Sequence, residues 1–382
     1  MRIAVVNLTQ GGLSGGYWKY LENMAPLMRD DPRVERLDVF MPPGSQWPEV
    51  GELATYTWPA EDARLGYTRL KAQLRRLAPD VVFIPTARWL DCGRVPTVVM
   101  VRNMEPLSVP FGGNSVLEGC KNLARAWAAR EACRRATRVI AVSQHVYDFL
   151  ATRWKISRDK IGLVYHGIEA PPGRSQAIEP QVLRSAELRR FIFTAGSIRP
   201  ARGLEDLIGA MAVLAADGEA LTLVIGGRPD PGSQSYMLKM QRLAGERRVS
   251  ERIIWAGQLN ALEMSWCFYN CAAFVTTSRA EACPNTALEA MSHGCAVVST
   301  RQPPMPEFFG ESAWYYHPRD TRDLAEKIKL ALGASPEQLQ ARRAAARARA
   351  RDFTWRETAT ATIGQLVLAQ TPGVASEEHG QT

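Results

Sequence analysis

Two glutamates, Glu281 and Glu289, stand with seven residues between them in a stretch that predicts a loop followed by a short helix. Pro284 suits the first position of that helix, and Gly294 suits the residue just past its end. Glu281 is therefore expected in the loop, and Glu289 about one turn into the helix. The N-terminus of such a helix offers free N–H groups and a partial positive charge, which suit a phosphate. A carboxylate one turn away can accept hydrogen bonds from both hydroxyls of a ribose.

The plainer interpretation of the two glutamates is that they are solvated residues beside a helix. The segments on either side of them favour a nucleotide site instead. Apolar runs at 272–277 and 295–299 predict strands, so the pair lies in a strand–loop–helix–strand unit. The words EACPNTALEAMSHGCAVVST resemble the Glu-x7-Glu motif of retaining glycosyltransferases of family 4 (glycosyl transferases group 1), which have the GT-B fold. This chain departs from that motif after the first glutamate, where Ala282-Cys283-Pro284 replaces the usual Gly-Phe-Gly.

The resemblance implies a nucleoside-diphosphate sugar as the donor substrate. It implies that Glu281 holds the sugar and that Glu289 holds the ribose. It also implies that the helix start, at Asn285 and Thr286, lies against the diphosphate. The diphosphate leaves as the sugar becomes cationic, so this helix start would stabilise the departing charge.

A turn at 196–203 is expected to add cations to the same site. In the family this turn carries an arginine and, five residues later, a lysine that clamp the diphosphate; the two places fall here on Ser197 and Arg202. Arg202 keeps a cation that can grip phosphate, and Arg199 could supply the charge that Ser197 lacks. The alternative is that both arginines are surface residues of a turn. We expect Arg199, Arg202 and Glu281 to be the catalytic residues.

Glycine-rich turns follow several predicted strands. The strand at 3–8 leads into a glycine-rich turn and then a helix from 17 to about 28, which is a phosphate-approach geometry, although the GxGxxG spacing of dinucleotide sites is missing. A flexible crossover turn is the plainer interpretation. The resemblance gives Gly15 and Gly16 a role at the donor. Gly227 follows another strand, in a glycine turn at the expected mouth of the sheet, and is also expected to bind the donor. In the family the nucleobase lies near the residues that correspond to Gln258 and Leu259.

The acceptor side is expected after the strand at 97–101. Family members often have a histidine there that touches the donor sugar, and this chain has none. Arg102, Asn103 or Glu105 is expected to serve instead. His293 has no carboxylate or second histidine near it in sequence, so we interpret it as a structural residue.

The length of 382 residues suits two domains. Strand signals at 3–8, 37–41, 81–84, 97–101, 138–142 and 161–165 alternate with helical stretches, which predicts an α/β fold with a doubly wound parallel sheet. A second alternating set begins near 191. Two such sets agree with the GT-B fold that the resemblance implies, in which two Rossmann-like domains face each other across a cleft. The expected boundaries are 1–170 for the N-terminal domain, completed by a C-terminal helix at 353–370, 171–188 for a linker, 189–352 for the nucleotide-sugar domain, and 371–382 for a disordered tail.

Charge and cysteine content bear on location. The net charge of +8 is uneven, since residues 1–170 carry 23 Lys/Arg against 17 Asp/Glu, or +6, and the rest carries 24 against 22, or +2. The helix near 117–135 is basic and has Leu117, Leu123 and Trp127 among its apolar residues. The plainer interpretation is that those charges form the solvated face of the helix. The alternative is that they bind an anionic membrane surface. Seven cysteines without a CxxC, and no apolar run long enough to span a bilayer, favour a cytoplasmic setting, peripheral on the inner membrane face.

These features predict a retaining glycosyltransferase that acts on a glycan acceptor, lipid-linked, in bacterial-type cell-surface polysaccharide or glycolipid synthesis. No Asp-x-Asp ends a predicted strand, so no metal and no cofactor are expected. No nucleic-acid motif is present. A nicotinamide-dependent dehydrogenase is a rival that lacks its glycine fingerprint. A degenerate, non-catalytic sugar- or nucleotide-binding protein of the same fold remains the alternative, because Ser197, Asn103 and Ala282 depart from the family pattern.

Overall fold

A computed structural model of the protein describes residues 1–9, 15–45, 54–109, 111, 116–184, 190–230 and 232–371. The chain forms two compact units. The first contains Met1–Arg102, Ala126–His166 and the chain from Trp355 onward, and the second contains Asn103–Arg125 and Gly167–Thr354. Three predicted features fall partly or wholly outside the described residues, namely the glycine-rich turn at 11–14, the end of the linker at 185–188, and the tail from 372 onward.

Among the described residues, the first unit contains one parallel sheet of seven strands in the order β3-β2-β1-β4-β5-β6-β7. Its strands are β1 (Arg2–Val6), β2 (Arg36–Met41), β3 (Ala54–Thr57), β4 (Val81–Ile84), β5 (Thr97–Val101), β6 (Arg138–Ala141) and β7 (Ile161–Leu163). β4 and β5 are continuous apolar runs, as expected of strands that helices cover on both faces. The sequence analysis missed β3, an edge strand whose exposed residues, Ala-Thr-Tyr-Thr, lack a hydrophobic signal.

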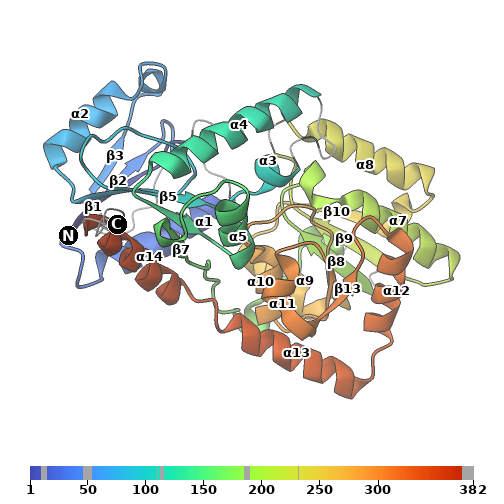
Figure 1. Cartoon of the computed structure of the whole chain (residues 1–382). Helices are drawn as coiled ribbons and strands as arrows, with labels where there is room; N and C mark the ends of the chain where they lie inside the picture. The colour runs from blue at the N-terminus through green and yellow to red at the C-terminus, as the bar shows by residue number, and fades with distance from the viewer. Residues whose placement is uncertain are drawn as a thin grey trace, which may run out of the picture. The chain divides into compact units, whose positions relative to one another are not determined.

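The helices of the first unit are α1 (Gly15–Arg29), α2 (Thr68–Leu77), α5 (Gln144–Thr152) and α14 (Trp355–Gln370), together with the second part of α4 (Val116–Arg135). The start of α4 and the short helix α3 (Glu105–Ser108) belong to the second unit. α14 comes from the far end of the sequence and packs on α1 and on β4, β5 and β6, as Figure 1 shows for the dark red helix. Its inner face buries Trp355, Ile363 and Leu366. The last helix of the chain therefore belongs to the core of the first unit.

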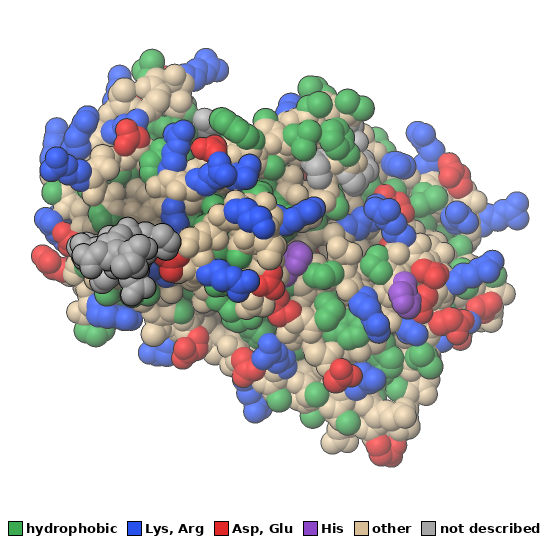
Figure 2. Space-filling model, viewed as in Figure 1, with side chains coloured by type: hydrophobic (Ala, Val, Ile, Leu, Met, Phe, Trp, Pro, Cys, Tyr) green, Lys and Arg blue, Asp and Glu red, His purple; other side chains and the backbone are tan. Residues whose placement is uncertain are grey.

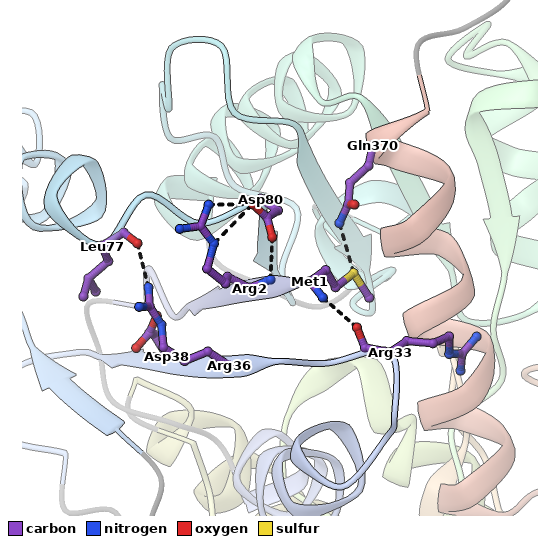
Figure 3. A network of polar contacts seen from close by, with 8 residues as sticks. All are labelled: Met1, Arg2, Arg33, Arg36, Asp38, Leu77, Asp80 and Gln370. Carbon is purple, nitrogen blue, oxygen red and sulfur yellow. Dashed lines mark hydrogen bonds and ion pairs between the residues drawn. The ribbon is translucent and has the colours of Figure 1, made fainter.

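A polar network closes the amino ends of the strands in the first unit (Figure 3). The Arg2 guanidinium lies 2.8 Å from the Asp80 carboxylate, and Asp80 also accepts from the Arg2 backbone N–H. The pKa of Asp80 is lowered, mainly by its hydrogen bonds from Arg2. Arg36 contacts Asp38 at 2.9 Å and donates to the Leu77 carbonyl, so charged side chains seal this edge of the sheet.

Among the described residues, the second unit contains one parallel sheet of six strands in the order β10-β9-β8-β11-β12-β13. These strands are β8 (Phe191–Ala195), β9 (Thr222–Gly226), β10 (Ile253–Gly257), β11 (Ala273–Thr276), β12 (Val297–Thr300) and β13 (Ala313–Tyr316). The prediction of an α/β fold with doubly wound parallel sheets is confirmed.

The helices of the second half of the chain are α6 (Gln181–Arg184), α7 (Leu204–Ala216), α8 (Gln234–Glu246), α9 (Ala261–Asn270), α10 (Asn285–Ser292), α11 (Met305–Phe309), α12 (Thr321–Leu332) and α13 (Pro336–Ala350). α7, α8 and α12 bury apolar residues against one face of the sheet. The arginines of the alanine- and arginine-rich helix α13 are not all solvated, because several contact other parts of the unit. Arg342 and Arg349 donate to the carbonyls of Glu311 and Glu307, and Arg347 lies against Gly294.

One local prediction needs correction. Pro284 is the residue before α10 and not its first residue, because the helix begins at Asn285. No helix in the described part of the chain is long and apolar enough to cross a membrane.

Candidate functional site

The sheet of the second unit opens at its carboxyl edge between β8 and β11. The two strands pair only at Ala273 with Ile192 and at Phe274 with Phe193. Beyond that point β8 continues along β9, and β11 continues along β12. The strand order also reverses between β8 and β11. From β8 the chain first continues to β9 and β10 on one side of it, and then to β11, β12 and β13 on the other. Such a switch point is where doubly wound sheets bind ligands.

Glycines let the chain turn sharply on the β8 side of this opening. Gly196 has a φ of +134°, and a Cβ there would lie 2.1 Å from a guanidinium nitrogen of Arg202. Gly227 has a φ of +132°, and a Cβ there would lie 2.0 Å from the carbonyl oxygen of Gly196. Gly227, predicted as a donor-binding residue, thus has a packing role as well, because it lets the end of β9 approach the turn after β8.

Arg202 and Glu281, two of the three predicted catalytic residues, meet across the opening. An Arg202 Nη1–Glu281 Oε1 distance of 2.9 Å defines an ion pair, in which the side chains are 22% and 12% exposed. The same Nη1 donates to the hydroxyl of Ser278 at 3.2 Å. The structure therefore brings together one residue from the turn after β8 and one from the loop after β11.

Arg199, the third predicted catalytic residue, has other partners. Its guanidinium lies 3.0 Å from Glu105 and 3.7 Å from Asp230. Glu105 was predicted on the acceptor side, and Asp230 was not predicted at all. Ser197 lies between Gly196 and Arg199 in the same turn and is partly exposed.

The first two residues of α10, Asn285 and Thr286, are polar and partly exposed. The side-chain oxygen of Asn285 is buried and has no hydrogen-bond partner among the described residues. Thr286 and Glu289 are both partly exposed, and Glu289 follows Asn285 by about one helical turn. Because α10 starts after Pro284, its first amide groups are close to the loop that holds Glu281. These positions agree with the expected order of loop, helix start and second glutamate.

Gln258 and Leu259, the predicted nucleobase contacts, follow β10 and border a cavity of about 400 Å³. Gln258 is exposed, whereas Leu259 is buried and its methyl group lies against Gly226. The Leu259 side chain is therefore mostly occupied by packing. The other residues at this cavity are Pro180, Gln181, Val182, Ala256 and Glu263.

The predicted acceptor residues are divided between the two units. Arg102, in the first unit, stacks over the ring of Tyr17 at 4.2 Å and lies 5.4 Å from that of Tyr20. Asn103 and Glu105 belong to the second unit, where the Asn103 side chain accepts a hydrogen bond from the Glu105 backbone N–H. Asn103 therefore shapes the turn that starts α3.

Gly15 and Gly16, the remaining predicted donor residues, are the first two residues of α1 and not part of a loop. A Cβ at Gly16 would meet nothing within 4 Å, so packing within the unit does not require glycine there. His293 has the predicted structural role: it caps α10 beside the carbonyl of Glu289 at 2.7 Å and lies 3.0 Å from the Ser265 hydroxyl.

Sequence reasoning missed a cluster of charged residues behind the ion pair. Arg279 contacts Glu205 at 3.3 Å and Asp206 at 3.5 Å. Burial raises the pKa of Asp206, and the Arg279 charge opposes that shift. The one signal for Arg279 was its place two residues before Glu281. In the described part of the chain no group of three or more His, Cys, Asp or Glu residues could hold a metal ion.

The two glycine turns generate a stability prediction. Gly227→Ala should lower the free energy of unfolding by more than Gly218→Ala, a matched control in the same unit. Gly218 also has a positive φ but open space around it, so alanine there should cost about 1–2 kcal/mol from the backbone alone. At Gly227 the clash with the Gly196 carbonyl adds to that cost. Urea unfolding of both variants measures the difference, and equal costs would contradict the close approach of the two turns.

Comparison with known proteins identifies the family. The model of the family described as Glycosyl transferases group 1 matches residues 175–349, and that of Glycosyltransferase Family 4 matches residues 40–170. The serotype-specific mannosyltransferase WbdA of Escherichia coli is 25% identical over 235 residues, or 59% of this chain. A glycogen synthase of Mycobacterium tuberculosis is 28% identical over 250 residues, or 65% of this chain. The matched regions are 28% of the former and 56% of the latter.

Solved structures share the fold over nearly the whole chain. Anabaena Alr3699/HepE in complex with UDP and glucose has a TM-score of 0.74 at 18% identity, covering 96% of this chain and 99% of that one. WaaG, a glycosyltransferase involved in lipopolysaccharide biosynthesis, has a TM-score of 0.70 at 16% identity, covering 94% and 99%. The chain therefore belongs to the group 1 glycosyltransferases of the family 4 type, and its two Rossmann-like units are those of the GT-B fold.

Proposed function

We propose that this protein is a retaining glycosyltransferase that moves a sugar from a nucleoside-diphosphate sugar to a glycan acceptor. The observation that carries the proposal is the Arg202–Glu281 ion pair at the sheet opening, next to the start of α10. A cation, a carboxylate and a helix N-terminus lie close together there, and these are groups that can bind a sugar diphosphate.

Each group has a distinct task in the proposed reaction. The amide groups at the start of α10 and the Arg202 guanidinium would bind the diphosphate, and Glu289 would accept from the ribose hydroxyls. Glu281 would hold the sugar hydroxyls. Gln258 would lie near the nucleobase, at the cavity after β10. Arg199 would join the diphosphate by exchanging its contact with Asp230 or Glu105 for one with phosphate.

The chemistry follows from where charge develops. As the bond from sugar to phosphate breaks, negative charge grows on the diphosphate and positive charge on the sugar ring. Arg202 and the α10 start would stabilise the first, and the Glu281 carboxylate the second. Preorganised groups of this kind contribute about 3–4 kcal/mol each to the transition state. With no protein nucleophile assigned, the acceptor would attack on the face that the diphosphate leaves, and the anomeric configuration would be retained.

The names of related proteins support this substrate class. HepE structures contain UDP, UDP and glucose, or UDP-glucose. WbdA is a mannosyltransferase, WaaB is a lipopolysaccharide outer-core galactosyltransferase, and WaaG is involved in lipopolysaccharide biosynthesis. A role in cell-surface polysaccharide or glycolipid synthesis is the corresponding proposal for this chain.

A non-catalytic nucleotide- or sugar-binding protein is the alternative. It is favoured by Ser197, which carries no charge, and by Ala282, which is buried where the family has a glycine. Turnover separates the two functions, since both bind a nucleotide and only the enzyme releases nucleoside diphosphate from the donor when an acceptor is present.

Nucleotide binding tests the site directly. A thermal-shift panel of UDP, GDP, ADP and NAD should show stabilisation by one nucleoside diphosphate and none by NAD.

Glu289→Ala should weaken the binding of that nucleotide by about 1.5–3 kcal/mol, because a charge-assisted contact to the ribose is lost. Isothermal titration calorimetry measures this, with Glu326→Ala on the exposed face of α12 as the control. Unchanged affinity in Glu289→Ala would give Glu289 a structural role.

The proposed chemistry uses arginines and a helix N-terminus, so a divalent cation is not needed to neutralise the diphosphate. Sugar transfer should therefore continue in excess EDTA at an unchanged kcat. The measurement is the rate of nucleoside-diphosphate release with and without chelator, followed by addition of Mg²⁺ or Mn²⁺. Loss of activity in EDTA and its return with metal would overturn the metal-independent mechanism.

α4 supports the proposal that the protein contacts an anionic membrane. Val116, Cys120, Leu123 and Trp127 recur on one helical face, and all four are exposed, Val116 by 77% and Trp127 by 68%. Figure 2 shows apolar side chains near the amino end of α4 and Lys and Arg side chains over the surface around the helix. An exposed apolar stripe between basic residues suits the interface of an anionic bilayer.

The ion pairs of α4 limit its attraction to a membrane. Glu118 contacts Lys121 and Arg125, and Glu131 contacts Arg134 and Arg135. The helix carries five basic and two acidic residues, which leaves a net charge of +3. At about 1 kcal/mol for each basic residue near the surface, the charge alone gives a weak and salt-sensitive association. The apolar stripe would supply the rest.

Liposome flotation tests this membrane contact. The protein should float with anionic vesicles at low salt, be released at high salt, and ignore neutral vesicles. Arg134→Gln with Arg135→Gln should reduce flotation, and Leu123→Ser with Trp127→Ser should reduce it further. Arg242→Gln with Arg247→Gln, which removes the same charge from the exposed side of α8 and its end, is the control and should float normally. Equal binding to neutral and anionic vesicles would end the electrostatic proposal and leave only the apolar stripe as the membrane contact. No binding to either would point to a water-soluble acceptor.

A further inference from the structure

We infer that Arg279 is a positioning residue that holds the Arg202–Glu281 ion pair across the opening between β8 and β11. The inference rests on the proposed function, because it assigns Arg279 a part in sugar transfer through that pair. Arg279 is not itself placed to touch the donor, since its guanidinium points toward the start of α7.

The turn after β8 and the loop after β11 are not joined by a ladder of backbone hydrogen bonds. β8 and β11 last pair at Phe193 and Phe274, two residues before each strand ends. Beyond that point, the backbone N–H of Arg279 donates to the Ala201 carbonyl at 2.7 Å. The hydroxyl of Thr277 donates to the Arg202 carbonyl at 2.7 Å. These two contacts hold the loop after β11 against the turn after β8.

The close approach of the loops is visible at Gly203. This residue has a φ of +62°, and a Cβ there would lie 2.5 Å from the Thr277 carbonyl oxygen and 3.1 Å from Nε of Arg279. No other residue type fits between the turn and the loop without moving one of them. The Arg279 side chain therefore lies directly over the residue that links the turn to α7.

The guanidinium of Arg279 completes the contact. It lies 3.3 Å from Glu205 and 3.5 Å from Asp206, in the first turn of α7, and its side chain is only 17% exposed. A cation at a helix N-terminus is normally unfavourable, because the helix end carries a partial positive charge. The two carboxylates offset that cost. Because these charges are poorly solvated, removing one partner should cost more than it does in a surface ion pair.

The two carboxylates are fixed from other parts of the unit. Glu205 accepts from the hydroxyl of Tyr236, on α8, at 2.9 Å. Asp206 accepts from the hydroxyl of Tyr316, on β13, at 3.3 Å and from the Arg319 backbone N–H at 3.1 Å. The anchor for Arg279 thus draws on α7, α8 and the end of β13, all within the second unit.

The consequence for Glu281 follows from chain connectivity. Only Ala280, itself buried, separates Arg279 from Glu281. A loop fixed at Arg279 therefore fixes the backbone of Glu281, while Thr277 and the Arg279 N–H fix the backbone of Arg202 and Ala201. The 2.9 Å contact of Arg202 with Glu281 depends on both sides being held.

Replacement of the side chain tests this role. Arg279→Met should lower kcat by about 10²-fold, the effect expected when catalytic groups shift by about 1 Å. The KM for the donor should change far less, because the α10 start and Glu289 are untouched. Arg279→Lys should recover part of kcat, since it keeps the charge but lacks the planar fork that spans two carboxylates. Arg252→Met is the control: Arg252 donates to the Glu219 carbonyl at the opposite end of the sheet, and kcat should be unchanged.

A double-mutant cycle separates positioning from general destabilisation. If Arg279 acts through Arg202, then Arg279→Met in an Arg202→Met background should lower kcat much less than it does in the wild-type protein. Full additivity of the two effects would overturn the inference. So would a wild-type kcat in Arg279→Met.

A readout that needs no activity keeps the two proposals distinct. If the wild-type protein transfers no sugar, the proposed function fails and the kinetic tests do not apply. Hydrogen exchange of the amides in 277–283 then decides the inference. Exchange should be faster in Arg279→Met than in both the wild-type protein and Arg252→Met. Equal exchange in all three would show that Arg279 does not hold the loop.

Discussion

The break in the hydrogen-bond ladder between β8 and β11 is the constraint on which the candidate site depends. A parallel sheet that reverses its strand order must separate two neighbouring strands at their carboxyl ends. The separation creates room for a ligand, but it also removes the backbone contacts that would hold the flanking loops. Two side chains, Arg202 and Thr277, reach from one loop to the other instead, and a single backbone hydrogen bond from Arg279 to Ala201 joins them.

Charge compensation is the second feature of the site. Arg199, Arg202 and Arg279 each contact carboxylates, namely Glu105 and Asp230, Glu281, and Glu205 and Asp206. Partly buried cations need such partners, because a charge that loses its water without a counter-charge is costly. A donor diphosphate would therefore compete with carboxylates for Arg199 and Arg202. The protein would exchange one set of charged contacts for another, with little rearrangement of the backbone.

A cluster of aromatic side chains lies in the core of the first unit. Tyr20, His166 and Trp355 form one buried cluster, with ring centroids 5.1 Å apart for Tyr20 and His166, and Arg102 lies over Tyr17 beside it. Burial, with a contribution from the Arg102 charge, lowers the pKa of His166 to about 3, so this histidine is neutral at physiological pH. Trp355 comes from α14, which is why the core of the first unit is complete only when the end of the chain has folded onto it.

The sequence by itself determined the α/β class, the parallel sheets, the family and the approximate places of Glu281, Glu289 and Arg202. These follow from local patterns, since buried parallel strands are continuous apolar runs and the Glu-x7-Glu spacing lies within one loop and one helix. Only the tertiary structure decided the partners. Arg202 meets Glu281 across 79 residues of sequence, and Arg279 meets Glu205 across 74. Arg199 contacts Glu105 and Asp230, and the buried side chain of Leu259 packs against Gly226. Contacts of this kind depend on how the strands are ordered in the sheet, and a local pattern of residues carries no record of that order.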